Sequence, residues 1–410
     1  MPSLLSVRVE NIDRSKLFVA SALLNSTGGG LMMAFLLIYF DRTTDVGLAV
    51  IGLAITVGRA LAAVTPALFG RLLDRFGPRR IAIFGDLTTG AGFLLCLLAE
   101  NAVFIVASQF LAQAGSHMFW TSSRGLVGLA SGGQGMQTWF GLIGSLRNIG
   151  LGIGTLLSAL AFSADSIPLL HVVVLCCALL YIGSTVALWA WRIDDERGPP
   201  EATAEEPEEP VGEGYRHVWA DRPYRRLLVL NMGLVLAAMV IPLVIAVYAT
   251  EQLGLPAFVA GALVLANTVV VAVLSTHVAA WTEKRPAIRN LTGGYALNVL
   301  AFVIFWIAAA AAGRPWAAAA LLGLAMLIYT VAEMISTPAA NVLSVSLAPS
   351  ERNGRHMAAF QMTWAIGMTL TPAVFGWLLT TGPHATWVAL IVLTLLCLLG
   401  GAAVGQRKEA

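Results

Sequence analysis

Long apolar stretches separated by short polar connections make up almost the whole chain. A helix that crosses a membrane needs about 20 mainly apolar residues. Twelve stretches meet this requirement, and they lie near 16–40, 47–70, 81–99, 102–129, 138–162, 168–191, 226–249, 257–280, 290–312, 316–345, 357–381 and 384–404. The pattern therefore predicts an all-α integral membrane protein with twelve transmembrane helices.

One hydrophilic stretch near 194–223 interrupts the pattern, and its centre is acidic and contains prolines. Such a composition is typical of a flexible linker. We therefore expect an N-terminal six-helix bundle over 1–193, a cytoplasmic linker over 194–223 and a C-terminal six-helix bundle over 224–410. The segments 126–150 and 342–367 each run from a helix end through a polar loop into a glycine-bearing helix. Two repeated halves with a site between them suit alternating access.

Basic residues are divided unevenly between the two ends of the predicted helices. The even-numbered connections hold Lys or Arg at 71, 75, 79, 80, 192, 197, 216, 222, 225, 226, 284, 285, 289, 352 and 355, whereas the opposite connections hold only Arg42 and Arg314. Because Lys and Arg near helix ends stay in the cytoplasm, both termini should be cytoplasmic, in a protein of the cell membrane. The N-terminal segment lacks an apolar region followed by a cleavage site, so we expect no removable signal peptide.

The composition agrees with a membrane protein, since 58% of the 410 residues are hydrophobic, only 12% are charged and the mean hydropathy is +0.78. The short connections leave no room for a catalytic domain outside the membrane, so we expect no enzyme. The four cysteines fall inside apolar stretches without metal-ligand spacing, which argues against a metal site or a disulfide framework. The net charge of +2 and the lack of a basic stripe with aromatics argue against nucleic acid as a partner.

The most informative connection joins the second and third apolar stretches, and it contains Gly70, Asp74, Arg75, Gly77, Arg79 and Arg80. The glycines permit a tight turn, Asp74 can cap a helix or form an ion pair, and the arginines keep the loop in the cytoplasm. This pattern resembles the signature loop between helices 2 and 3 of the major facilitator superfamily, although Pro78 is an unusual insertion. The resemblance implies a transporter in which this loop controls gating.

The fifth predicted helix contains Arg147, Asn148, Gly150 and Gly154. Glycines permit helices to approach closely and to slide or rock. The segment resembles the glycine-rich motif of the fifth helix in antiporters of the superfamily, and this resemblance implies a gating role. The family version usually has proline where this chain has Thr155, and glycine packing without a coupling role is the alternative.

The fourth predicted helix carries Gln109, Gln113, His117, Trp120 and Arg124 at spacings of four, four, three and four. These spacings place the five side chains on one helix face. Because five polar or amphipathic side chains would be costly in lipid, this face should line a water-filled cavity that binds substrate. A hydrogen-bonded seam between helices is the alternative.

Glu333 lies far from either end of the tenth predicted helix, with Tyr329 and Thr337 one turn away on the same face. An ionised carboxylate is expensive at this depth and a protonated one is tolerable, so Glu333 suits a proton carrier. A glutamate followed five residues later by proline, here Pro338, resembles the drug:proton antiporters of the superfamily. The alternative is a structural carboxylate paired permanently with an arginine.

Two further charged residues lie within predicted helices. Asp86 is near the start of the third one, where it could take part in proton coupling or be a hydrated or paired carboxylate near the surface. Arg59 lies in the middle of the second one, where its charge must be neutralised. Either an intramembrane acid such as Glu333 or an anionic group of the substrate could supply the opposite charge.

These features favour a secondary transporter driven by the proton gradient, with no bound cofactor, that exports small hydrophobic organic compounds as a functional monomer. Aromatic and methionine side chains suit loosely specified ligands, and the candidates are Met33, Trp120, Met326, Tyr329, Phe360 and Trp364. A carrier of organic anions that uses Arg59, Arg124 or Arg147 is the alternative within transport. A membrane sensor or assembly factor without transport is a remote alternative.

Overall fold

The computed structural model describes residues 9, 11–33, 36–163, 166–191, 215–311, 313–349, 353–382 and 384–405. Within these ranges all regular secondary structure is helical. The acidic centre of the predicted linker lies outside the described residues. We refer below to residues 9–191 as the N-terminal half and to residues 215–405 as the C-terminal half.

The helices of the N-terminal half follow one another with short connections. Their bounds are η1 Ile12–Ser15, α1 Lys16–Met33, α2 Leu36–Thr43, α3 Leu48–Ala62, α4 Thr65–Cys96, α5 Ala102–Ser131, α6 Met136–Ser163 and α7 Ile167–Ala190.

The C-terminal half begins with a short helix that follows the described gap. Its bounds are α8 Arg216–Ala220, α9 Arg222–Ala238, α10 Val240–Leu243, α11 Ile245–Val247, the π-helical turn η2 Tyr248–Gln252, α12 Ala257–Thr282, α13 Ala287–Ala308, η3 Ala309–Ala311, α14 Pro315–Ser346, α15 Asn353–Thr380 and α16 Ala385–Gly405.

Every predicted apolar stretch coincides with one or more of these helices. Among the described residues, eight helical segments are long and apolar enough to span a membrane, and the pair α1–α2, bent by 52°, makes a ninth. One of the eight, Val50–Cys96, covers two predicted stretches. These stretches merge because α4 continues through a break at Gly77, where φ is 77° and ψ is 164°. The chain is therefore a multi-pass helical membrane protein, while twelve crossings and cytoplasmic termini stay predictions.

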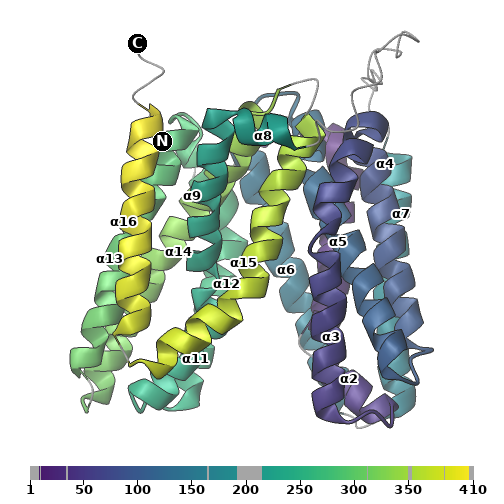
Figure 1. Ribbon diagram of the computed structural model, residues 1–410, viewed down its shortest axis with the longest axis horizontal. Coiled ribbons are helices and arrows are strands. Elements are labelled where there is room, and N and C mark those ends of the chain that lie inside the picture. Colours follow the sequence, from purple (N-terminus) through teal and green to yellow (C-terminus); the bar gives the residue numbers. More distant parts are fainter. Residues whose placement is uncertain are drawn as a thin grey trace.

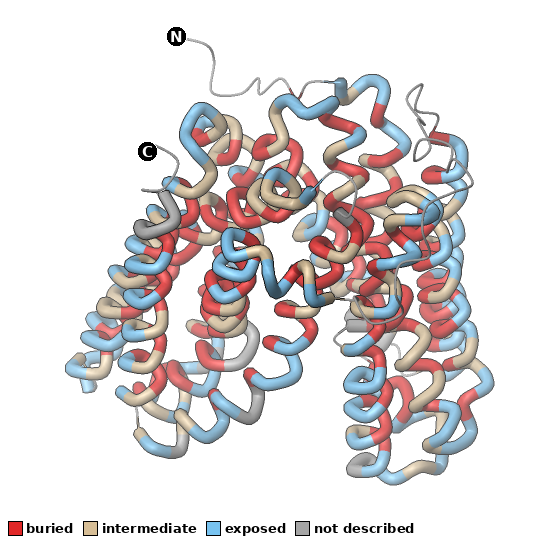
Figure 2. Tube along the Cα trace, turned by 45° about the horizontal axis from the view of Figure 1, so that its top comes forward, coloured by how far each residue is buried: buried red, intermediate tan, exposed pale blue. Residues whose placement is uncertain are grey.

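The two halves lie side by side, and their ribbons converge at the end that carries α8 and diverge toward the end that carries α2 and α11 (Figure 1). Buried residues lie mainly along the inward-facing sides of the helices within each half, whereas the outer sides are exposed (Figure 2). Each half has its own apolar core. In the C-terminal half, for example, Phe305 and Trp387 stack with ring centroids 4.6 Å apart. In the N-terminal half, Phe18 stacks on Trp191 at 5.1 Å. Each half is therefore packed around an interior of its own.

Helices α1 and α6 pack very closely because glycines meet at their crossing. A Cβ atom added to Gly150 would lie 2.7 Å from the Cβ of Ser26, and one added to Gly154 would lie 2.7 Å from the backbone nitrogen of Leu31. The neighbouring Gly152 has open space around it. Gly150 and Gly154 thus join two helices of the same half.

Candidate functional site

Asp74 connects the two halves at the end where they converge. Its Oδ1 accepts a hydrogen bond from the backbone nitrogen of Gly354 at 2.6 Å, and its Oδ2 lies 3.7 Å from Nε of Arg355. Gly354 is in the first turn of α15, where backbone N–H groups lack partners within the helix and the helix dipole favours negative charge. Asp74 of α4 therefore caps a helix of the opposite half.

The glycines around Asp74 allow α4 and α15 to touch. A Cβ atom on Gly70 would lie 3.1 Å from the Cβ of Ala358, and one on Gly354 would lie 2.8 Å from the nitrogen of Asp74. The hydroxyl of Tyr215, which follows the described gap, donates to the carbonyl of Ala67 at 2.6 Å. The sequence motif at 70–80 thus forms a packed junction between the halves.

The other predicted gating residues of this motif act within the N-terminal half. Arg79 donates to the carbonyls of Leu188 at 2.8 Å and Trp189 at 2.5 Å, and so caps the end of α7. The guanidinium of Arg75 lies over the neighbouring Phe76 ring at 5.3 Å, and Arg80 is exposed. Gly77 supplies the break in α4 through its positive φ.

Arg124 of α5 is held by the C-terminal half. Both terminal nitrogens donate to Oε1 of Gln361 at 3.1 Å, and Nε donates to Oδ1 of Asn341 at 3.2 Å. The guanidinium also lies over the Phe360 ring, 4.6 Å from its centroid, and one nitrogen donates to the Trp120 carbonyl at 3.0 Å. Arg124 and Phe360, both predicted to bind substrate, therefore form a buried bridge between the halves.

Glu333 lies two helical turns from Asn341 on the same face of α14, farther from the junction at Asp74. Its Oε2 accepts from Nδ2 of Asn267 of α12 at 3.1 Å. The charge of Arg147 in α6, from the other half, interacts with that of Glu333, although no ion pair within 4.0 Å joins them among the described residues. The guanidinium of Arg147 lies over the Trp120 ring at 4.9 Å.

Three side chains of this group are accessible to solvent. Arg147 is exposed although it lies in the middle of α6, and Glu333 and Trp120 are partly exposed. Arg147 lies against Trp120 of α5 and interacts electrostatically with Glu333 of α14, so both halves contribute to the group. This group of Trp120, Arg147, Asn267 and Glu333, the central polar group below, can bind solutes and hold a proton.

The remaining polar residues predicted on α5 do not all lie beside the central polar group. Gln109 is buried, and its amide is 3.9 Å from the sulfur of Cys96 within the N-terminal half. His117 is also buried, and Gln113 is partly exposed. The polar face thus divides into a seam inside the half and the residues Trp120 and Arg124 at the junction.

Among the predicted aromatic and methionine ligands, Met326 and Tyr329 are part of the apolar core of the C-terminal half. The hydroxyl of Tyr329 donates to the carbonyl of Ala237 at 3.3 Å, and not to the carboxyl of Glu333. Trp364 is partly buried beside Phe360. Of these residues, Trp364 is the one with surface left for a ligand in this conformation.

Asp86 is fully buried inside the N-terminal half, not at a hydrated surface. Its Oδ1 accepts from Nδ2 of Asn25 at 2.7 Å, and its Oδ2 accepts from the hydroxyl of Ser184. These two donors, from α1 and α7, are uncharged.

Arg59 of α3 is exposed and forms no ion pair with the described residues. Asn148 donates to the carbonyl of Gly144 at 3.0 Å in its own helix.

Three amide side chains of the site were not predicted from the sequence, namely Asn267, Asn341 and Gln361. Asn341 carried a usable signal, since it follows Glu333 by eight residues and shares its helix face. Asn267 and Gln361 stand in apolar surroundings without such a spacing. The packing of α12 against α14 within the C-terminal half brings Asn267 to Glu333, and the contact between the halves brings Gln361 to Arg124.

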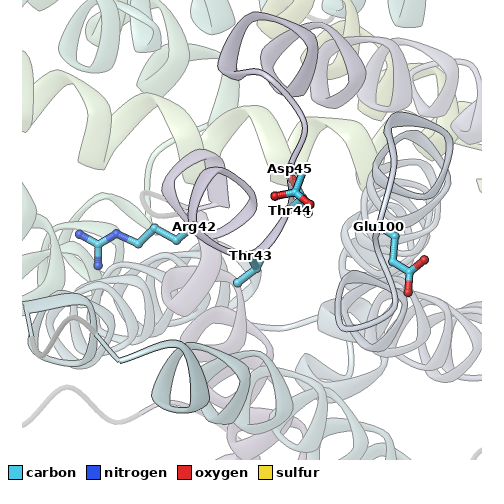
Figure 3. Close-up of a pocket in the computed structure, with 5 residues that line it drawn as sticks. All are labelled: Arg42, Thr43, Thr44, Asp45 and Glu100. Atoms are coloured by element: carbon cyan, nitrogen blue, oxygen red, sulfur yellow. The ribbon is translucent and has the colours of Figure 1, made fainter.

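A separate surface hollow lies at the diverging end of the N-terminal half, lined by Arg42, Thr43, Thr44, Asp45 and Glu100. In Figure 3 the Arg42 side chain extends away from Glu100, so the two charges do not converge on one point. The described residues include no group of three or more His, Cys, Asp or Glu side chains that could hold a metal ion.

A multi-pass helical protein with polar residues gathered between two halves has the architecture of a secondary transporter. The family profile described as "Major Facilitator Superfamily" matches residues 18–372. The chain therefore belongs to the major facilitator superfamily, and it is a transporter of small molecules rather than an enzyme.

Relatives in sequence carry the name multidrug resistance protein MdtH. The protein of Yersinia enterocolitica is 24% identical over 382 residues, which cover 90% of each chain. The protein of Klebsiella pneumoniae is 25% identical over 369 residues, which cover 88% of this chain and 87% of the relative.

Solved structures share the fold. A bacterial homologue of the iron transporter ferroportin aligns with a TM-score of 0.73 at 14% identity, covering 96% of this chain and all of that chain. The human organic anion transporter MFSD10 aligns with a TM-score of 0.69 at 14% identity, with the same coverage. At this identity the likeness concerns the fold alone.

Proposed function

We propose that this chain is a proton-coupled exporter of small, largely hydrophobic organic compounds that works by alternating access in the cell membrane. The observation that carries the proposal is the position of Glu333. Its carboxyl lies in the middle of α14, receives one amide hydrogen bond from Asn267 and is partly exposed. Names of relatives at 24–25% identity support a drug-like substrate.

The chemistry of coupling follows from the surroundings of Glu333. When the carboxyl is ionised, Asn267 and the charge of Arg147 stabilise it, and when it is protonated, Arg147 loses the attraction of this carboxylate. Because Arg147 belongs to the other half, the charge state of Glu333 changes the attraction between the halves. Proton binding can thereby favour one of the two access states.

Transport in inverted membrane vesicles tests the proposal. With an imposed pH gradient, wild-type protein should concentrate a lipophilic cationic dye such as ethidium, and Glu333→Gln should abolish this accumulation. Dye binding to purified protein should change little, since the amide imitates the protonated carboxyl. Glu251→Gln is the matched control, because Glu251 is exposed on η2, away from the central polar group.

A Glu333→Gln protein that accumulates the dye against its gradient like wild type would overturn proton coupling through this residue. Loss of dye accumulation in both variants would point to general damage instead.

A second function, transport of an organic anion, is favoured by a different observation. Arg59 and Arg147 are both exposed, and neither forms an ion pair within 4.0 Å among the described residues. An anionic group of a substrate could bind these guanidinium groups. The binding of acidic and neutral ligands by Arg59→Ala separates the two functions.

A further inference from the structure

Arg147 and Arg124 differ in what holds their guanidinium groups. The guanidinium of Arg124 donates three hydrogen bonds to Gln361 and Asn341. That of Arg147 lies over the Trp120 ring, 4.9 Å from the centroid, and forms no hydrogen bond or ion pair with the described residues. The side chain of Arg147 is also exposed. Arg124 is therefore fixed, whereas Arg147 can change partners.

The surroundings of Trp120 hold its ring in one place. The buried Phe119 ring meets it edge-on, with the two centroids 5.4 Å apart. The carbonyl of Trp120 accepts a hydrogen bond from Arg124 at 3.0 Å. The ring packs against the apolar core of the N-terminal half and is still partly exposed. A fixed and partly exposed indole ring is a surface on which a flat aromatic compound can stack.

Glu333 is the alternative partner of Arg147. The two charges interact, although no ion pair within 4.0 Å joins them among the described residues. Oε2 of Glu333 accepts a hydrogen bond from Asn267, and the residue is partly exposed. Because arginine carries its guanidinium on a long flexible stem, Arg147 can turn from the ring to the carboxyl.

Two further groups act on this pair of charges. Arg124 of α5 repels Arg147, and the phenol of Tyr329 lies near Glu333 on α14. Tyr329 is fixed by its hydrogen bond to the carbonyl of Ala237, and a phenol is uncharged at neutral pH. A cation–π contact and a solvent-accessible ion pair are similar in strength. Occupation of the ring by another molecule can therefore decide where Arg147 lies.

We propose that a flat aromatic compound stacks on Trp120 in place of Arg147, which then turns to Glu333 and expels its proton. The proton passes from the carboxyl to water, because an approaching positive charge favours the ionised carboxylate. In the reverse direction, a proton bound to Glu333 returns Arg147 to the ring and displaces the compound. The exchange rests on the proposed proton-coupled export. It adds a substrate class, flat aromatic compounds with or without charge, and makes Arg147 the link between compound and proton.

Proton release on ligand binding tests the exchange without a membrane or a pH gradient. The purified full chain, in detergent and weak buffer, is mixed with a planar dye across a pH series. A pH indicator records the protons released, and equilibrium dialysis records the bound dye. Two dyes are used, the cation ethidium and the uncharged Nile red. Nile red is decisive, because an uncharged dye cannot repel a proton by its own charge.

Both dyes should release protons from wild type, up to one for each bound dye molecule. Arg147→Gln should bind Nile red and release few protons or none, whereas Arg147→Lys keeps the charge and should retain most of the release. Trp120→Leu should bind both dyes about tenfold more weakly. Trp281→Leu is the matched control, because Trp281 near the end of α12 forms the same kind of contact with Arg285 at 4.6 Å.

Three results would overturn the exchange. One is equal proton release by Arg147→Gln and wild type with Nile red bound. Another is release from wild type with ethidium but not with bound Nile red, since the dye charge would then act directly. The third is a wild-type protein that binds neither dye. If Arg147→Gln fails to fold, Trp120→Leu takes its place, and an unchanged affinity for both dyes would overturn the proposal.

Glu333→Gln separates the exchange from the function on which it rests. Lost release in Glu333→Gln together with retained release in Arg147→Gln would leave proton coupling through Glu333 standing and refute the exchange alone. Release by Glu333→Gln equal to that of wild type would refute both. Lost release in Glu333→Gln and Arg147→Gln, with dye still bound in each, is the result expected.

Discussion

Both terminal nitrogens of Arg124 donate to Oε1 of Gln361, at 3.1 Å each, and the two residues belong to opposite halves of the chain. Arg124 is buried, so its charge depends on these bonds and on Asn341 for compensation. Separation of the halves at this level would leave the guanidinium without these partners. We therefore expect Arg124 to bind water or a substrate only after the halves separate at this level.

Gln361→Leu should destabilise the closed arrangement by about 1.5–3 kcal/mol, because it removes the acceptor of two bonds from a charged group. The measurement is the rate at which a thiol reagent labels a cysteine introduced at the converging end. Labelling should become faster in Gln361→Leu and stay unchanged in Gln134→Leu, whose glutamine is exposed in the connection between α5 and α6. Equal labelling rates in Gln361→Leu and wild type would contradict the bridge.

Asp74→Asn should also favour opening at the converging end, since an uncharged side chain caps α15 less well and loses its attraction to Arg355. The expected cost is about 1–2 kcal/mol. Thiol labelling should become faster and dye flux slower, with equilibrium binding changed less than turnover. Arg75→Gln is the comparison, because the guanidinium of Arg75 lies over Phe76 of its own helix. Lost dye affinity with unchanged labelling would show that Asp74 acts on binding instead.

Arg59→Ala decides between the two transport functions. If Arg59 binds an anionic group, the variant should bind acidic ligands more weakly by about 2–5 kcal/mol and neutral ligands of similar shape as before. If the transported compounds are neutral or cationic, binding of both ligand classes should be retained. Calorimetric titration with matched acidic and neutral ligands measures the affinity of wild type and Arg59→Ala for each ligand class. Arg147→Ala is the companion variant, and it should alter the pH dependence of flux for every substrate, because Arg147 interacts with Glu333.

Gly150→Ala should lower stability by about 1–3 kcal/mol, because the added methyl group would meet Ser26 and the backbone of α1 at less than contact distance. Gly152→Ala, two residues away in open space, should not cost stability. Thermal unfolding of the two purified variants compares them directly. A melting temperature of Gly150→Ala equal to that of Gly152→Ala would show that α1 and α6 are less closely packed than described.

The sequence predicted the positions of the helices well, because an apolar stretch of membrane-spanning length has few alternatives to helix. The sequence also predicted a gating role for Asp74, because the motif that contains it is a contiguous segment of the chain. The partners of Asp74 were not predictable, because Gly354 lies in the other half of the chain. The hydrogen bonds that Gln137 and Thr138 at the start of α6 donate to Glu283 of the other half were not predictable for the same reason.

The surroundings of single charged residues were predicted less well from the sequence than the positions of the helices. Counting along the helix placed Asp86 near a surface, yet α1 and α7 cover it and supply Asn25 and Ser184 as donors. Tyr329 shares a helix face with Glu333, but its hydroxyl binds the carbonyl of Ala237 in α9. Spacing fixes the face of a helix, whereas the neighbouring helices decide what that face contacts.

Tyr215 joins the start of the C-terminal half to α4 of the N-terminal half. It packs against the apolar cluster that contains Val218 and Tyr224, and its hydroxyl donates to the carbonyl of Ala67 at 2.6 Å. Opening of the converging end would therefore break this hydrogen bond together with the cap that Asp74 forms on α15. A phenylalanine at position 215 would keep the apolar packing and remove the hydrogen bond. Tyr215→Phe thus separates the contribution of this contact to closure from that of the signature loop.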